Sequence, residues 1–467
     1  MKLPYVASLL PPKGAVSAFG RPGATDMPST EPSAAPGFRL PRLCLPRPGI
    51  DLSRWAVVAC DQYTSEPGYW QRADQVVGDA PSTLRLIFPE VFLEAGDAPA
   101  RVGHIQAAMH DYQARGLFVE HGGAVLVERS VDGRTRRGLM LELDLEHYDY
   151  SPTSSSLIRP TEGTIVARLA PRIAVRRDAE LELPHILVLI DDPGCTVIEP
   201  LAAARPDLIP LYDADLMLGG GRVAGFAVGA AAGERAAQAL SALARPAVFE
   251  QRHGVPAGTP PMLFAVGDGN HSLATAKAIW DQARATVGPD HPSRWALVEV
   301  ENIHDPALHF APIHRLLFGV QADLRAALAA AFGARATVTP CDSAATMRHR
   351  VQAVAQGAQA FGLIEPGARF SVVEIPEPPA ALAVGSLQGF VDGLLAQGGA
   401  AQVDYVHGDD VIEHLGQVEG NAGFHVPGLG KHELLNRVVR GGPLPRKTFS
   451  MGEAHEKRYY VEARRIR

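Results

Sequence analysis

The residues most capable of chemistry lie in the stretch MLFAVGDGNHSLATAKAI, at positions 262–279. An apolar run there predicts a strand, and two glycines then mark a tight turn before a helix. Glycine lets backbone N–H groups line a concavity, and a helix N-terminus adds partial positive charge. Together they favour an anion, above all a phosphate. The residues expected to cradle that phosphate are Gly267, Asp268, Gly269, Asn270, His271 and Ser272.

Two side chains of this turn can take part in a reaction. Asp268 would repel a bare phosphate, so we expect it to hold a divalent cation such as Mg²⁺ or to contact a substrate hydroxyl. His271 can donate a hydrogen bond to a phosphate oxygen or act as an acid or base. Asn270 or Ser272 would cap the helix. The alternative is an ordinary strand–turn–helix corner, in which Asn270 and His271 only satisfy the turn backbone.

Further carboxylates follow another apolar run. Asp61, Tyr63 and Glu66 come after the run WAVVAC, where a strand would open into a loop. Glu66 is a candidate general base that takes a proton from a substrate hydroxyl. Alternatively, Glu66 and Pro67 only begin a helix, because proline is favoured in the first helical turn.

The segment RPTEGT, at positions 159–164, is a dense polar loop. Arg159 can bind phosphate or carboxylate through two hydrogen bonds. Glu162 is a second candidate base, and Thr161 and Thr164 are counted with the phosphate-binding residues. A solvated loop with no binding role is the alternative.

Two groups in the sequence resemble metal ligands. Asp191 and Asp192 end a predicted buried strand, which suits Mg²⁺, although a plain turn before Pro193 explains them equally simply. His304, His309 and His314 are spaced by five residues, which does not place them on one helix face. We therefore favour a single working histidine, His304 or His314, beside Arg315, over a zinc site.

The C-terminal tail is the second strong signal. Its alternating pattern over 445–451 predicts a strand with Lys447 on one side, and its cations would supply positive charge to the phosphate turn. A solvated basic tail is the alternative, but the aromatic and apolar residues interleaved with the charges favour packing against the body. The polar residues concerned are Arg446, Lys447, Thr448, Ser450, Glu453, His455, Lys457 and Arg458.

The pattern of predicted elements indicates an α+β, or mixed-sheet α/β, fold. The segment 139–146 alternates leucine with acidic residues, which predicts a half-buried antiparallel strand. Other strands are predicted at 124–128, 185–190, 262–266, 295–300, 361–364 and 370–375, and helices at 234–244, 323–332 and 387–396. The helix after the phosphate turn is predicted to bury Leu273, Ala276, Trp280, Ala283 and Val287. Residues 1–37 are expected to form a flexible extension, 38–319 the main domain and 320–467 a C-terminal α+β portion.

Composition excludes several classes of protein. The chain has 467 residues, 46% of them hydrophobic, with 44 basic and 51 acidic residues and a net charge of −7. A mildly acidic chain is a poor nucleic-acid binder, and the apolar runs are too short to span a membrane. The four cysteines form no CxxC pair, which argues against a zinc or disulfide framework. The N-terminus does not read as a secretory signal, so we expect a cytoplasmic protein that acts on a small molecule.

Several motifs resemble the domain of unknown function 1015 family. In sequence order they are CDQYTSEPGYW, GDAPSTL, RPTEGT, LIDDP, YDADLMLGGG, VGDGNHSLATAKA, ENIHDPALHFAPIHR and LPRKTFSMGEAHEKRYY. The family's turn is similar to the phosphate-binding turn of the ParB/sulfiredoxin superfamily, which includes nucleotide-dependent serine kinases. The resemblance thus implies a ParB/sulfiredoxin-like core, ATP, ADP or another nucleotide, and phosphoryl transfer involving serine or phosphoserine. Asn270 and Ser272 stand where the family's turn has His and Arg, so positive charge must come from elsewhere.

The sequence therefore predicts a phosphotransferase with Mg²⁺ and a nucleotide or phosphate as partners. In this hypothesis Glu66 or Glu162 is the base, and Arg159, Lys447 and Arg458 neutralise the transferred group. Two alternatives stay open: a nucleotide- or metabolite-binding regulatory protein without turnover, and a phosphate-ester hydrolase that uses water as the acceptor. The oligomeric state is not determined by the sequence.

Overall fold

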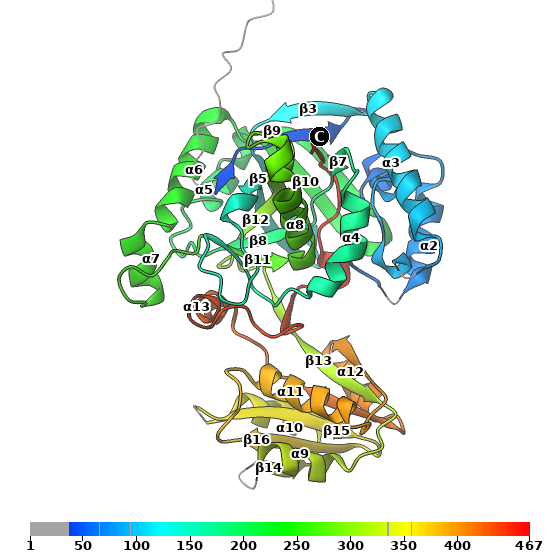
Figure 1. The fold of residues 1–467 in the computed structure, drawn as a ribbon, viewed down its shortest axis with the longest axis vertical. Coiled ribbons are helices and arrows are strands. Elements are labelled where there is room, and N and C mark those ends of the chain that lie inside the picture. Colours follow the sequence, from blue (N-terminus) through cyan, green and yellow to red (C-terminus); the bar gives the residue numbers. More distant parts are fainter. Residues whose placement is uncertain (1–36, 65, 94, 334–335, 356) are drawn as a thin grey trace, which may run out of the picture. The chain divides into compact units, whose positions relative to one another are not determined.

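The computed structural model describes residues 37–64, 66–93, 95–333, 336–355 and 357–467, which belong to one unit, Ala34–Arg467. The expected N-terminal extension lies, apart from Gly37, outside these residues. In the described part of the chain the strands form two large sheets and two short pairs (Figure 1). The α+β fold class predicted from the sequence is confirmed. The boundary at 319/320 stays a prediction.

The first sheet has nine strands within the described residues. Along it lie β6 (Ile158–Pro160), β11 (Phe264–Asp268), β8 (Leu187–Ile190), β12 (Trp295–Asn302), β5 (Arg134–Asp144), β4 (Val125–Val131), β10 (Gly221–Ala227) and β9 (Ile209–Leu216), with β1 (Phe38–Arg39) paired to β5. β11 runs parallel to β6 and antiparallel to β8. Hence the ends of β6 and β11 and the start of β8 meet at one edge of the sheet, where the site is built.

Helices cover one face of this sheet and a mixed layer covers the other. Leu169, Leu201, Leu240 and Trp280 bring four helices onto the first face, and Figure 1 shows α4 and α8 side by side there. Tyr69, Trp70, Tyr459 and Tyr460 pack on the second face, against Val127 and Met140. The helices before the second sheet are α1 (Leu52–Trp55), α2 (Pro67–Val77), α3 (Ala98–Ala114), α4 (Leu169–Arg176), α5 (Glu199–Ala203), α6 (Ala230–Leu243), α7 (Pro246–His253) and α8 (Asn270–Val287).

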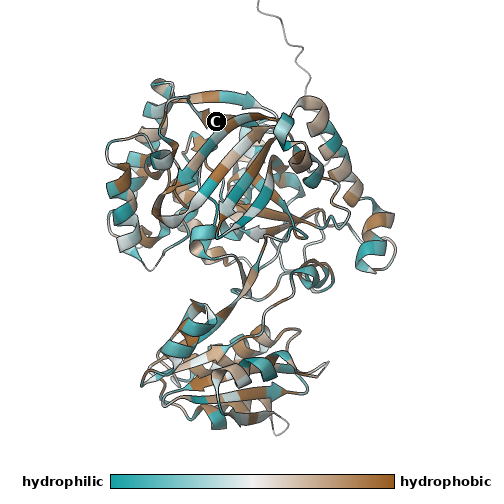
Figure 2. Cartoon of the chain, turned by 180° about the vertical axis from the view of Figure 1, so that it is seen from behind, coloured by the Kyte–Doolittle hydropathy of each residue, from teal (hydrophilic) through white to brown (hydrophobic). Residues whose placement is uncertain are grey.

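The prediction that 139–146 is half-buried was wrong. The strand β5 is antiparallel to its neighbours, as expected, but Glu142 and Asp144 are as buried as the leucines between them. Glu142 forms ion pairs with Arg39 and Arg464, and Asp144 with Arg294. Paired carboxylates can be buried, so alternation here separates an apolar face from a charged but covered one. Figure 2 shows hydrophilic as well as hydrophobic residues along the strands of the first sheet.

The second sheet contains seven strands among the described residues. Its order is β14 (Thr337–Cys341), β16 (Arg369–Ile375), β15 (Gln359–Glu365), β18 (Asn421–His425), β13 (Phe310–Phe318) and β17 (Gln402–His407), and β19 (Phe449–Met451) pairs with the start of β13. α9 (Leu324–Phe332) and α11 (Ala383–Ala396) pack on one face, while α10 (Ala344–Gln352) and α12 (Asp409–Gly416) pack on the other. α13 (Lys431–Gly441) packs against the first sheet through Leu434 and Val438.

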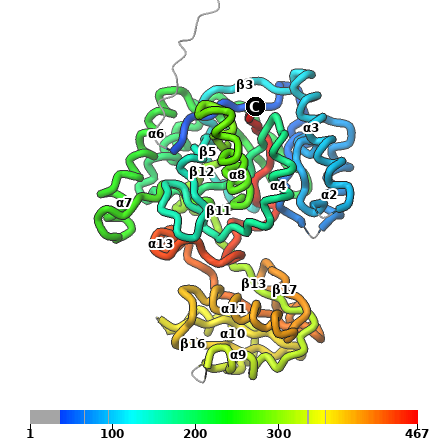
Figure 3. The backbone as a smooth tube through the Cα atoms, in the orientation of Figure 1, coloured from blue at the N-terminus to red at the C-terminus, as the bar shows by residue number. Residues whose placement is uncertain are grey.

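The end of the chain returns to the first sheet and its neighbours. β20 (Arg464–Arg465) pairs with β7 (Leu181–Glu182), and Val58 forms a bridge with Tyr459. β2 (Arg42–Pro46) pairs with β3 (Phe118–Gly122), and Cys44 bridges to Ala463. Figure 3 shows this red segment running among the elements of the first half of the chain. Among the described residues, no helix combines the length and apolar character that crossing a membrane requires.

Candidate functional site

The turn predicted to bind phosphate, residues 267–272, joins β11 to α8, and Gly269 is the single residue between these two elements. Gly269 is the N-cap, in the left-handed conformation at φ 74°, where a Cβ would approach the backbone of Ile186 to 3.0 Å. The prediction that Asn270 or Ser272 caps the helix was wrong, because α8 begins at Asn270 and no side chain caps it. The backbone N–H groups of Asn270 and His271 have no partner among the described residues, as in the first turn of any helix.

The buried face of α8 is shorter than predicted. Leu273, Ala276 and Trp280 are buried, whereas Val287 is 40% exposed. The helix therefore packs on the sheet only through its first three turns, which hold its N-terminus at the sheet edge.

A polar cavity of about 580 Å³ opens at this edge of the sheet. This polar cavity is within the size range of small-molecule sites. It brings together the turn and side chains from distant parts of the sequence. The charged groups in its lining are Asp61, Glu66, Glu90, Glu162, Arg168, Arg172, Asp268, Asp404, Arg446, Lys447 and Lys457.

Lys457 is the cation that touches the phosphate turn. Its Nζ lies 3.1 Å from Asp268 Oδ2 and donates to Ser450 Oγ at 3.1 Å, and only 6% of its side chain is exposed. Asp268 Oδ1 accepts from its neighbour, the Gly269 N–H, at 3.0 Å. Asp268 thus carries a partly neutralised carboxylate directly beside the free N–H groups of α8.

Glu162 positions the loop that carries Arg446 and Lys447. Its two carboxylate oxygens accept the backbone N–H groups of Lys447 and Thr448, each at 3.1 Å. Arg315, fully buried, donates to the carbonyls of Lys447 at 2.9 Å and Arg446 at 3.2 Å. The predicted strand over 445–451 was wrong for its first half, because these bonds hold 445–448 as a turn and Lys447 at φ 56°. Burial raises the pKa of Glu162.

Asp61 and Glu90 form the acidic wall of the cavity. Burial alone would raise the pKa of Asp61, but His185 and the Gln62 amide outweigh it and hold the pKa below its usual value. Burial and Asp61 raise the pKa of Glu90, which receives two hydrogen bonds from Arg172 at 2.7 and 2.5 Å. A deprotonated carboxylate therefore lies near one that gains a proton readily.

His271 is held neutral inside the cavity wall. Burial, with Arg172 and Arg168 nearby, lowers its pKa to about 4, and its Nε2 accepts the Ile165 N–H at 3.4 Å. A neutral ring with its Nδ1 as the donor can bind an anion, but it carries no proton to release near pH 7.

The pH dependence of stability should reveal this neutral histidine. In the unfolded chain the pKa is 6.5 and in the folded chain about 4, so the unfolded state binds the proton more tightly. Stability is then lost as pH falls from 6.5 towards 4, and His271→Gln should remove about 1–2 kcal/mol of that loss. Urea unfolding at pH 7.5 and pH 5 measures it, with the exposed His110→Gln as the control. An identical pH dependence in His271→Gln and the natural protein would contradict the assignment.

Several predicted site residues lie outside the polar cavity. Arg159 is 5% exposed and donates to the carbonyls of Ser156 and Pro260, because it points away from the turn on β6. Thr161 Oγ1 donates to the Val266 carbonyl. The full set of predicted residues that the cavity lining lacks is Arg159, Thr161, Thr164, Asp191, Asp192, His455 and Arg458.

The other residues outside the cavity lining have local partners of their own. Asp192 accepts the N–H groups of Thr196 at 2.5 Å and Val197 at 2.9 Å, which makes it a turn-forming residue. Asp191 pairs with His304 at 2.7 Å. His455 pairs with Asp132 at the surface. Arg458 is buried among core carboxylates. These residues do not line the polar cavity, so they are not brought to the turn at Asp268, and their role as phosphate or metal ligands stays a prediction.

The family comparison agrees with the motifs quoted above. The model of a family described as a protein of unknown function, DUF1015, matches residues 44–393. The chain belongs to the DUF1015 family. No curated protein matches its sequence. A free serine kinase in complex with AMP aligns with 11% identity and a TM-score of 0.36, covering 71% of this chain and 91% of that chain.

Two other solved structures align with this DUF1015 protein at similar levels. A conserved hypothetical protein from Pyrococcus furiosus has 13% identity and a TM-score of 0.34, over 69% of this chain and 90% of its own. A C-terminally truncated SbnI from Staphylococcus aureus has 13% identity and a TM-score of 0.34, over 66% and 83%. Scores this low do not establish a shared fold for the DUF1015 chain.

Three residues that line the polar cavity, Glu90, Arg168 and Arg172, had no signal in the sequence. They approach the turn only because α4 packs beside α8 and Arg172 of α4 binds Glu90. His185, which contacts Ser272 but lies outside this lining, had none either. A second, mostly apolar cavity of about 140 Å³ shares Glu90, Arg172 and Ser272 with the polar one. Ser272 therefore lies in the wall between the two cavities.

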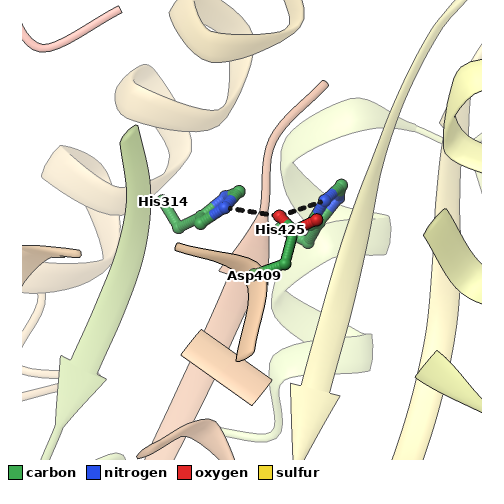
Figure 4. A group of neighbouring side chains, drawn as sticks. All are labelled: His314, Asp409 and His425. Atoms are coloured by element: carbon green, nitrogen blue, oxygen red, sulfur yellow. Dashed lines mark hydrogen bonds and ion pairs between the residues drawn. The ribbon is translucent and has the colours of Figure 1, made fainter. Parts of the chain in front are cut away.

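A separate cluster on the second sheet offers metal-ligand atoms. Figure 4 shows His314 of β13, His425 of β18 and Asp409 of α12, whose candidate ligand atoms lie within 4.8 Å of one another. Both histidines direct Nε2 to Asp409 Oδ1, at 3.0 and 3.2 Å. However, His314 Nδ1 accepts the Val426 N–H at 3.1 Å. A neutral imidazole that accepts at Nδ1 carries its proton on Nε2, so His314 donates to Asp409 rather than binding a metal.

Removing the carboxylate of this cluster should destabilise the protein. Asp409→Ala leaves two buried Nε2–H groups without an acceptor, so we expect the free energy of unfolding to fall by about 1–3 kcal/mol. Asp410→Ala is the matched control, because Asp410 lies in the same first turn of α12 and is exposed. Urea unfolding gives the difference, and Co²⁺ should produce no ligand-field absorption with either variant or the natural protein. A Co²⁺ spectrum that disappears in Asp409→Ala would favour a metal site instead.

Proposed function

We propose that this protein transfers a phosphoryl group between a nucleotide and a small hydroxy amino acid such as serine. The observation that carries the proposal is the free N–H turn of α8 facing Lys457 and Lys447 across a cavity that also holds several carboxylates. Phosphoryl transfer depends mainly on positioning the reacting groups and on neutralising charge. In this cavity the N–H groups of α8 can position a phosphate, and the lysines can neutralise its charge. The ParB/sulfiredoxin-like character of the core is part of this proposal.

Each group has a role in this hypothesis. The N–H groups of Asn270 and His271 bind phosphate oxygens, and Lys457, Lys447 and Arg168 neutralise the charge that moves with the phosphoryl group. Glu66, at the start of α2, is the base, because it lines the cavity and its side chain caps no helix N–H. Glu162 is a positioning residue instead, because backbone N–H groups occupy both of its oxygens.

Magnesium fits this cavity as a partner of the phosphates. Asp61, Glu66 and Asp268 offer the hard oxygen ligands that Mg²⁺ prefers, and no three carboxylates converge on one point among the described residues. Mg²⁺ commonly binds through one or two carboxylates together with substrate phosphates, so one of these side chains suffices. Bound there, the ion would reduce the repulsion between the carboxylates and the phosphates.

A binding protein without turnover is the second candidate. The ion pair between Lys457 and Asp268 favours it, because a paired Asp268 is less available to a cation. Such a protein would bind the nucleotide and form no product.

A coupled assay tests both candidates. The protein is incubated with Mg²⁺, serine and ATP, ADP, GTP or CTP, and in the reverse direction with phosphoserine, and phosphoserine and nucleotide products are measured. We expect transfer with at least one nucleotide and its loss in Asp268→Asn. A shift in melting temperature without any product would identify the binding protein. Release of inorganic phosphate without transfer to serine would identify a hydrolase.

A further inference from the structure

The Ser272 side chain carries a hydroxyl group within hydrogen-bond distance of a histidine. Ser272 is the third residue of α8, and its Oγ lies 2.8 Å from His185 Nε2. It lines the polar cavity beside the free N–H groups of Asn270 and His271. A hydroxyl within hydrogen-bond reach of an imidazole, at the positive end of a helix, is the arrangement that activates a serine nucleophile.

The hydrogen bond between Tyr460 and His185 holds the imidazole ring with its Nε2 directed at Ser272. Tyr460 Oη lies 2.8 Å from His185 Nδ1 and accepts the Cys60 N–H at 3.1 Å. In the tautomer in which the Tyr460 oxygen accepts from Nδ1–H, Nε2 is unprotonated and faces the Ser272 hydroxyl. His185 can therefore accept the proton of the Ser272 hydroxyl.

The carboxylate of Asp61 is close enough to stabilise a protonated His185 ring. Asp61 Oδ2 lies 3.8 Å from His185 Nε2, and His185 itself is 8% exposed. An imidazolium formed there would be attracted to Asp61 in a region that water scarcely enters. Ser272, His185 and Asp61 come from three distant segments that meet because β8 begins beside the end of β11.

We propose that Ser272 is phosphorylated as an intermediate in the transfer reaction, which rests on the proposed function. In the first half, Oγ attacks the terminal phosphorus of the nucleotide, its proton moves to His185 Nε2, and the bond from phosphorus to the leaving phosphate oxygen breaks. In the second half, the acceptor hydroxyl attacks the phosphorus and loses its proton to Glu66. The bond from Ser272 Oγ to phosphorus breaks, and Oγ recovers a proton from His185.

The experiment uses the full-length protein with Mg²⁺ and ATP, or whichever nucleotide supports transfer, but without an acceptor. A covalent intermediate predicts one phosphate group per chain after acid quenching, mapped to Ser272 by mass spectrometry. It also predicts exchange of labelled ADP into ATP without acceptor, because the first half-reaction is reversible. Ser272→Ala should abolish labelling and exchange, and His185→Gln should slow both by about 100-fold or more. Ser241→Ala, on α6, is the matched control and should change neither.

The outcomes separate this inference from the proposed function. Phosphoserine formation from added serine, without exchange and undiminished in Ser272→Ala, would overturn the intermediate and leave direct transfer standing. Neither transfer, exchange nor labelling with any nucleotide would overturn both. Circular dichroism and melting curves of each variant show that a loss of labelling is not a loss of folding.

Discussion

Replacing Lys457 with methionine should lower kcat/KM for phosphoryl transfer by about 100-fold or more. The Nζ of Lys457 lies 3.1 Å from Asp268 Oδ2, and 6% of its side chain is exposed. Bulk water therefore screens the charge of Lys457 only weakly. Without that charge, the uncompensated Asp268 carboxylate faces the phosphate at the N-terminus of α8. Initial rates over a range of nucleotide concentrations measure the effect.

Two further variants show whether that loss comes from charge. In Lys457→Met with Asp268→Asn, the repulsion is removed, so part of the lost nucleotide affinity should return. Lys277→Met is the control, because Lys277 lies on α8 and pairs with Asp281 outside the polar cavity. A Lys457→Met protein with normal kinetics would show that Lys457 only supports the fold.

Replacing Arg458 with methionine should lower the free energy of unfolding by about 3–5 kcal/mol. Arg458 is 3% exposed and pairs with Glu299 and with Glu462, the latter at 2.5 Å, while it donates to the Pro184 carbonyl at 2.8 Å. Burial alone would lower its pKa, but the two carboxylates outweigh burial and raise it. Removing the guanidinium leaves both acids buried without a counter-charge. Urea unfolding at pH 7 gives the magnitude.

The controls for Arg458 follow from its neighbours. Arg465→Met removes an exposed ion pair with Glu120 and should change stability by less than about 1 kcal/mol. Arg458→Met combined with Glu299→Gln and Glu462→Gln should recover part of the loss, because the stranded charges are gone. A loss below about 1 kcal/mol in Arg458→Met alone would mean that these carboxylates find other partners or take up protons.

Local sequence determined the secondary structure around the site. The apolar run before Gly267 forms β11, the glycine at 269 adopts the left-handed conformation, and α8 starts directly after it. These features depend on neighbours within a few residues, so periodicity and glycine reveal them. The strands at 185–190, 295–300 and 370–375 are confirmed for the same reason.

Tertiary structure alone decided which charges meet. In the sequence, Arg159 and Lys457 are both cations within a dense polar segment. In the structure, Arg159 donates hydrogen bonds to backbone carbonyls, whereas Lys457 forms an ion pair with Asp268. Likewise, His314 finds Asp409 and His425 rather than the two histidines nearest to it in the sequence. Side-chain partners across a sheet edge depend on strand order. Strand order cannot be predicted from the residues of any one strand, because neighbouring strands come from distant parts of the sequence. The glycines that form the turn before α8 can therefore be identified from the sequence. The charged side chains that surround this turn are known only from the assembled sheet.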